Sequence, residues 1–270
     1  MLKTERMDRV RAALRAQGLT QMIVCDPKSV WYLTGVAVEP YERLLALYLP
    51  TEGEPVLFLN RLFNVPEPPC RAVWHTDTDK PVAQIAEVVD AGRPLGIDKE
   101  WPAKFLIPLM ETHPGMQVVL SSDCVDDCRA CKDAEEQTLM REASRINDAV
   151  NETAKHYIKA GMTEREVAEF IDAQFRAHGC EGPSFTTIVS FGANAADPHH
   201  EPDDTVLKEG DCVLFDMGCV KSRYCSDITP VAGGLTDGTT GTAAAERGID
   251  LRKALREHAA YEALEPLGGY

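Results

Sequence analysis

"CVLFDMGCVKSRYCSDITP", residues 212–230, holds two aspartates, Asp216 and Asp227, each inside a run that predicts a β-strand. A buried carboxylate is costly unless it has a partner, and neighbouring strands can bring two carboxylates within a few ångströms. At that range like charges repel, unless a cation lies between them. The pair therefore indicates a site for two divalent metal ions. Because two aspartates alone are not a specific signal, loop or helix-cap roles stay open as the alternative.

Two histidines come before this stretch in the polar loop GANAADPHHEPDDTVLKEGD, residues 192–211. The loop connects strands of the same predicted sheet, so His199 or His200 would be able to exchange a proton with a substrate at a metal pair. Two solvated loop histidines are the alternative. Oxygen-rich ligand sets favour manganese, cobalt or zinc over copper.

The composition narrows the class of protein. The chain has 270 residues, 44% hydrophobic and 26% charged, which suits one or two globular domains. The net charge of -15 argues against nucleic acid and anionic membranes as partners, because both would repel such a surface. The N-terminus is charged and amphipathic, unlike a secretory signal, and no run approaches the roughly 18 apolar residues of a membrane span. We therefore expect a cytoplasmic protein.

Residues 1–128 alternate between helix and strand signals. Alternating elements of this length predict an α/β domain with a mixed sheet. The expected helices are 3–18, a short helix or turn ended by Gly35, 82–91 and 103–113, and the expected strands are 22–25, 44–50, 55–60, 72–75, 94–98 and 116–122.

The polar segment DDCRACKDAEE, residues 126–136, is typical of a domain junction. Three of the nine cysteines, Cys124, Cys128 and Cys131, cluster at this point. A zinc site would need a fourth ligand and a more regular double pair, so reduced thiols are the favoured interpretation.

Residues 129–229 predict an α+β domain. Two long helices, about 133–160 and 164–178, are separated by AGMTE, in which Thr163 forms a capping box with Glu166. The first helix has an expected apolar stripe at three-to-four spacing: Leu139, Ala143, Ile146, Val150, Ala154 and Tyr157. The expected strands are 186–191, 212–218 and 223–229.

The loop and the stretch that follows it resemble the pita-bread metallopeptidases, a family that includes aminopeptidase P and Xaa-Pro dipeptidase (prolidase). The segments FTTIVSFGANAADPHHEP and LKEGDCVLFDMGCVKSRYCSDIT carry the resemblance: His199 precedes Asp216 by seventeen residues, and Asp216 precedes Asp227 by eleven. CKDAEEQTLMREASRINDAV resembles the first catalytic-domain helix, and SVWYLTG resembles the creatinase-type N-terminal domain of the proline-specific branch. The resemblance covers roughly residues 5–229.

The resemblance implies a pita-bread fold for the second domain and metal-dependent hydrolysis of N-terminal Xaa-Pro peptide bonds. It implies that Asp216 binds one of two divalent metal ions, manganese first and cobalt or zinc next, and that Asp227 bridges both. His199 would hydrogen-bond the substrate and stabilise the tetrahedral intermediate. Proline-containing peptides are the implied partners, together with a second copy of the chain in a homodimer.

The resemblance ends at Pro230. Proline lacks an amide donor and is expected to end the strand, and residues 231–248 are dominated by Gly, Thr and Ala. We therefore expect 230–270 to be an atypical tail on a truncated, incomplete pita-bread domain. The family's remaining ligands, a His and two Glu, have no counterparts in it. His258 and Glu262 share one face of a short predicted helix, which is interpreted as a solvated face.

Whether the chain is an active enzyme stays open at this stage, because a metal site with two of its ligands would bind ions weakly. One alternative is a pita-bread relative that binds peptides or proteins without hydrolysis. Another is a creatinase-like amidinohydrolase, which shares the fold and needs no metal. The presence of both Asp216 and Asp227 argues against the amidinohydrolase.

Overall fold

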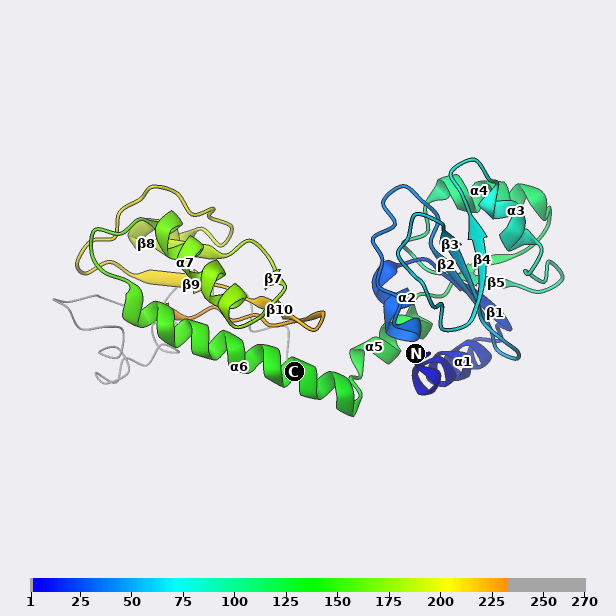
Figure 1. Cartoon of the computed structure of the whole chain (residues 1–270), viewed down its shortest axis with the longest axis horizontal. Coiled ribbons are helices and arrows are strands. Elements are labelled where there is room, and N and C mark those ends of the chain that lie inside the picture. Colours follow the sequence, from blue (N-terminus) through cyan, green and yellow to red (C-terminus); the bar gives the residue numbers. More distant parts are fainter. Residues whose placement is uncertain (1, 233–270) are drawn as a thin grey trace. The chain divides into compact units, whose positions relative to one another are not determined.

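The computed structural model describes residues 2–232 and separates the chain into two compact units, Met1–Lys132 and Asp133–Tyr270 (Figure 1). We call them the N-terminal unit and the C-terminal unit. The boundary follows residue 132, four residues later than the sequence predicts.

Residues 1 and 233–270 lie outside the described part of the chain. Most of the tail expected at 230–270 is therefore not described, and neither are His258 and Glu262. Among the described residues, no helix combines the length and the apolar character that crossing a membrane requires.

The N-terminal unit is an α/β domain on one mixed sheet, which confirms the fold expected for it. The six strands follow the order β4-β3-β2-β1-β5-β6. The pairs β1–β2 and β2–β3 are antiparallel, whereas β3–β4, β1–β5 and β5–β6 are parallel. The elements are α1 (Thr4–Ala16), β1 (Gln21–Val24), α2 (Pro27–Thr34), β2 (Ala46–Pro50), β3 (Val56–Asn60), β4 (Arg71–His75), α3 (Pro81–Ala86), β5 (Leu95–Ile97), α4 (Ala103–Thr112), β6 (Val118–Leu120) and α5 (Asp123–Ala130).

The central strand β1 has apolar clusters on both of its faces. All four of its residues are buried. Met22 and Val24 pack into one cluster with residues of α1, whereas Ile23 packs into another with Ile85 of α3. A strand covered on both faces is a continuous apolar run rather than an alternating one, as the sequence of β1 shows.

The sequence pattern does not predict helix α5, whose residues 126–130 fall in the segment interpreted as a polar domain junction. Cys124, Val125 and Cys128 of this helix are buried in the core of the N-terminal unit, and Cys131 just after it is exposed. Burial raises the pKa of the Cys124 thiol to about 11, so the thiol stays protonated near neutral pH. The packing of this helix also explains the later domain boundary.

The C-terminal unit is an α+β domain, again as expected. It has two short sheets, with strand orders β12-β9-β8 and β11-β10-β7. Its elements are α6 (Ala134–Tyr157), α7 (Glu164–Ala177), β7 (Gly182–Pro183), β8 (Ile188–Phe191), the 3-10 helix η1 (Gly192–Ala196), β9 (Val213–Asp216), β10 (Cys219–Lys221), β11 (Tyr224–Cys225) and β12 (Val231–Ala232).

Helices α6 and α7 pack on these strands and supply six of the fifteen buried residues of the apolar cluster (Figure 1). The stripe expected on α6 is present in Ala143, Val150 and Ala154, all with no exposed surface. Phe175 of α7 and Phe215 of β9 are buried in the same cluster. The strands are therefore held by helices whose apolar residues recur at three-to-four spacing.

Pro230 does not end the strand pattern, which corrects the sequence expectation. The Pro230 carbonyl accepts a hydrogen bond from the N–H of Phe215 at 3.0 Å, and Val231 pairs with Leu214 in antiparallel register. Proline removes only its own donor, so a strand can begin directly after it.

The capping box at the start of α7 is confirmed and gives a stability prediction. The N–H of Glu166 donates to Thr163 Oγ1 at 3.2 Å, and the N–H of Thr163 donates to Glu166 Oε2 at 2.8 Å. Thr163→Ala is expected to lower the free energy of unfolding by about 1 kcal/mol, because it leaves a helix N–H without its acceptor. Urea denaturation followed by far-UV circular dichroism measures this. Thr153→Ala at an exposed position near the end of α6 is the control, with an expected change within about 0.5 kcal/mol. Equal effects at both positions would contradict the capping role.

Candidate metal and substrate site

Asp216 and Asp227 lie on the same face of two chain segments that run antiparallel. Met217 and Ile228 form an isolated bridge, joined by N–H to O distances of 3.1 and 3.0 Å in the two directions. Both of these side chains pack into the core. Because side chains alternate along extended segments, Asp216 and Asp227 project from the opposite face.

The neighbouring contacts agree with this arrangement. Thr229 Oγ1 donates to Asp216 Oδ1 at 3.0 Å, so the residues on the two segments face each other. Asp216 ends β9 and is half-buried, whereas Asp227 is exposed and lies outside the strands. The expected strand 223–229 is therefore wrong in its second half, and its strand part is the short β11 (Tyr224–Cys225).

The two carboxylates interact electrostatically. Partial desolvation and then the negative charge of Asp216 raise the pKa of Asp227 above its ordinary value. A cation placed between the two would relieve this repulsion and would favour both ionised forms. The donor set and its electrostatics therefore fit a divalent metal ion.

The ten residues between the aspartates connect the two sheets. Strands β10 and β11 form a hairpin whose turn residues, Ser222 and Arg223, both have positive φ, at 50° and 67°. Two positive φ values define the turn type that matches the twist of a tight hairpin. The hairpin reverses the chain and brings Ser226 back beside Cys219. The N–H of Ser226 donates to the Cys219 carbonyl, and the N–H of Cys219 donates to Ser226 Oγ.

His199 lies on the loop before β9 and is exposed. Its main-chain N–H donates to Asp197 Oδ1 at 2.9 Å. Within residues 2–232, no hydrogen bond or ion pair joins His199 to Asp216 or Asp227. The structure thus brings the two aspartates together and leaves His199 as a separate loop residue.

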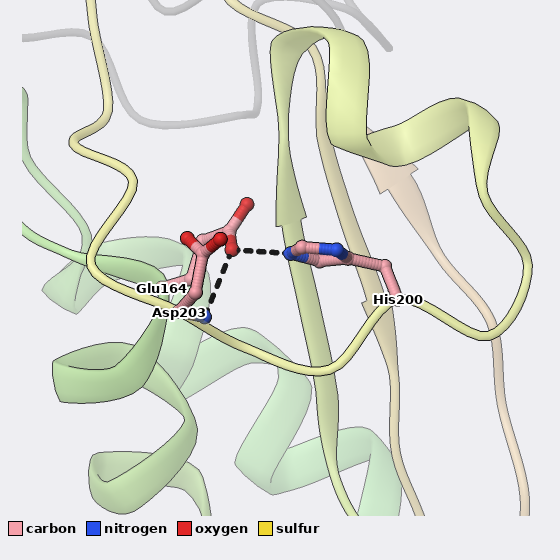
Figure 2. A group of neighbouring side chains, drawn as sticks. All are labelled: Glu164, His200 and Asp203. Carbon is pink, nitrogen blue, oxygen red and sulfur yellow. Dashed lines mark hydrogen bonds and ion pairs between the residues drawn. The ribbon is translucent and has the colours of Figure 1, made fainter.

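A second cluster, which the sequence did not indicate, lies beside this loop. Glu164, His200 and Asp203 offer ligand atoms that are all within 4.8 Å of one another (Figure 2). The only sequence signal at Glu164 is its place in the first turn of a helix, where acidic residues are common and usually exposed. Among the described residues it is the only group of three His, Cys, Asp or Glu side chains at this spacing.

This cluster fits a metal ion less well than the aspartate pair does. Glu164 already accepts two hydrogen bonds at Oε1 and two at Oε2, which uses all the acceptor positions of a carboxylate. His200 directs Nε2 at Glu164, at 2.6 Å, and must carry a hydrogen there because a carboxylate only accepts. An ion would have to break these buried bonds.

The fold defines the class: a chain with a creatinase-type N-terminal domain and a pita-bread second domain. Two family models cover nearly the whole chain: the creatinase/prolidase N-terminal domain matches residues 6–131, and metallopeptidase family M24 matches residues 138–264. The segment from residue 138 to residue 264 therefore belongs to metallopeptidase family M24.

Individual proteins support the same assignment. The chain is 30% identical over 224 residues to an uncharacterized peptidase from Staphylococcus epidermidis, covering 82% of this chain and 63% of that protein. Among solved structures it is similar to prolidase from Thermococcus sibiricus, with a TM-score of 0.80, 27% identity and coverage of 95% of this chain and 71% of that one. A dipeptidase from Pyrococcus horikoshii gives a TM-score of 0.78 and 29% identity, with coverage of 93% and 70%.

Two points about coverage follow. The chain spans less than two thirds of the length of the Staphylococcus epidermidis peptidase. The metallopeptidase match runs to residue 264, so it includes most of the stretch 230–270 that the sequence analysis set apart.

Proposed function

We propose that this chain is a metal-dependent peptidase that hydrolyses N-terminal Xaa-Pro bonds, with Asp216 and Asp227 as metal ligands and His199 as the substrate-binding catalytic residue. The observation that carries the proposal is the pair of carboxylates on one face, where the negative charge of Asp216 disfavours the ionised form of Asp227. Such a pair is electrostatically unfavourable by itself and becomes favourable around cations.

The chemistry of the residues is consistent with this proposal. Divalent ions bound there would activate a water molecule for attack on a peptide carbonyl. His199 is exposed and lies close to Asp197. Its ring would donate a hydrogen bond to the substrate and stabilise the negative charge that develops on the peptide carbonyl oxygen. Oxygen ligands favour manganese, with cobalt or zinc as alternatives. A homodimer and a cytoplasmic location, both expected from the sequence, stay predictions.

The test is metal-dependent hydrolysis by the purified 270-residue chain. With manganese added, we expect turnover of an Xaa-Pro dipeptide such as Ala-Pro, loss of turnover on chelation, and little turnover of Ala-Ala. The matched dipeptide separates proline-directed hydrolysis from general peptidase activity. Absence of both bound metal and turnover would contradict the proposal.

A second candidate is a pita-bread protein that binds proline-containing peptides without hydrolysis. It is favoured by one observation: within residues 2–232, no third His, Cys, Asp or Glu joins Asp216 and Asp227 in a tight group. Isothermal titration with Ala-Pro distinguishes the two functions. Binding without turnover in the presence of manganese would favour this candidate over the peptidase.

A further inference from the structure

The cluster of Glu164, His200 and Asp203 has a fully buried acid at its centre (Figure 2). Glu164 is 0% exposed, although it is the first residue of α7. A carboxylate at this depth is costly unless hydrogen-bond donors satisfy it. Residues 191–203 supply those donors. This segment includes His199.

Two donors reach Oε1 of Glu164 from the start of this segment. The main-chain N–H of Phe191 donates at 2.7 Å, and the side-chain amide of Asn194 donates at 3.0 Å. Phe191 ends β8, so the first bond ties the helix start to the sheet. Asn194 lies in η1, at the beginning of the loop.

Two more donors reach Oε2 from the end of the segment. The ring Nε2 of His200 lies at 2.6 Å, and the main-chain N–H of Asp203 donates at 3.2 Å. The first pair of donors therefore precedes His199 in the chain and the second pair follows it. Glu164 thus holds the loop on both sides of His199.

The adjacent histidines have different surroundings. The His200 side chain is 14% exposed and points to Glu164 in Figure 2, whereas His199 is exposed and makes its described hydrogen bond through the main chain. A side chain that must meet a substrate needs a fixed backbone and an open ring. The contacts of Glu164 fix the backbone on both sides of His199 and leave the His199 ring exposed.

We propose that Glu164 and His200 are positioning residues, which hold the loop so that the imidazole of His199 meets the substrate. This inference rests on the proposed function for the role of His199. The hydrogen bonds between Glu164 and the loop stand independently of that role. Two kinds of experiment therefore test the loop contacts and their catalytic consequence separately.

The first experiment compares kcat and KM for Ala-Pro with manganese in three variants of the full chain. Glu164→Gln and His200→Leu are expected to lower kcat by about ten- to a hundred-fold, as loss of supporting contacts does, with KM changed less than about two-fold. His200→Gln keeps an N–H donor at a similar reach and is expected to stay within about three-fold of the native kcat. A loss in His200→Gln as large as in His200→Leu would overturn the positioning role, because it would assign the proton chemistry to His200 itself.

A double-mutant cycle then tests whether these residues act through His199. In a His199→Asn background, adding His200→Leu is expected to lower kcat by less than about two-fold, since the group being positioned is already absent. A merely structural role would give multiplied losses in the cycle, and that result would overturn the inference.

The second experiment does not need activity. Hydrogen exchange of the amides in 191–203 is expected to be about ten- to a hundred-fold faster in Glu164→Gln and His200→Leu, and near the native rate in His200→Gln. Unchanged exchange in the first two variants would overturn the positioning role. If the native chain shows no turnover while exchange responds as expected, the proposed function fails and the loop contacts stand.

Discussion

Replacing Asp227 with asparagine is expected to reduce manganese affinity and Ala-Pro hydrolysis by more than about a hundred-fold. Changing a residue that only supports a metal ligand lowers metal affinity or activity about ten- to a hundred-fold. Removing a proposed ligand itself should therefore exceed that range. Asparagine keeps the shape of the side chain and removes its charge, which confines the change to electrostatics and ligation. Manganese is expected to raise the melting temperature of the native chain, and the same substitution should abolish that rise.

The metal-free form of Asp227→Asn separates loss of a ligand from misfolding. The charge of Asp216 and partial desolvation disfavour the ionised form of Asp227, as its raised pKa indicates. Removing that charge should leave the metal-free variant at least as stable as the native chain near neutral pH. Asp204→Asn is the matched control, because Asp204 is 86% exposed and pairs with Arg165 on the surface. Equal loss of manganese binding in both variants would contradict the assigned role of Asp227.

Gly218→Ala is expected to destabilise the C-terminal unit by about 1–3 kcal/mol or more and to weaken manganese binding. A Cβ at this position would meet the carbonyl oxygen of Ser226 and the hydroxyl of Ser184 closer than real Cβ atoms approach, with the Ser226 carbonyl carbon at 2.9 Å. Ser226 immediately precedes Asp227, and its carbonyl accepts from Ser184 Oγ at 2.9 Å. Making room for a methyl group must therefore move the backbone that carries Asp227.

The measurement can follow each unit separately. All three tryptophans, Trp31, Trp74 and Trp101, lie in the N-terminal unit, so their fluorescence reports its unfolding. We expect Gly218→Ala to shift the part of the circular dichroism transition that the fluorescence does not follow, and to leave the fluorescence transition unchanged. Gly92→Ala is the control, since its Cβ meets only the end of the Asp90 side chain at 3.2 Å. Native-like stability of Gly218→Ala would show that Ser226 can move freely, against the close approach described here.

Local signals in the sequence predicted the elements well where the cause lies within a few residues. The capping box of Thr163, the left-handed Gly35 that ends α2 at φ 75°, and the apolar stripe of α6 are all present. Helix α5 was missed because its buried residues, at 124, 125 and 128, are embedded among aspartates. Its charged face dominated the pattern, although the helix packs by the other face.

Longer-range relations were predicted less well. The sequence predicts a single strand over 212–218. In the structure β9 ends at Asp216, and the chain enters β10 of the other sheet at Cys219, beside the close approach of Gly218 to Ser226. Pro230 was expected to end the pattern, yet its carbonyl and Val231 continue the pairing with β9. Strand pairing depends on partners distant in sequence, which residue patterns do not specify.

The sequence by itself predicted the fold classes of both parts of the chain and the spacing of His199, Asp216 and Asp227 that resembles a metallopeptidase. Only the tertiary structure decided that Asp216 and Asp227 share one face, since their ten intervening residues form a hairpin whose return depends on contacts across the chain. It also decided the environment of Glu164. A first-turn glutamate is normally solvated, and here a loop that returns some thirty residues later buries it and supplies its donors.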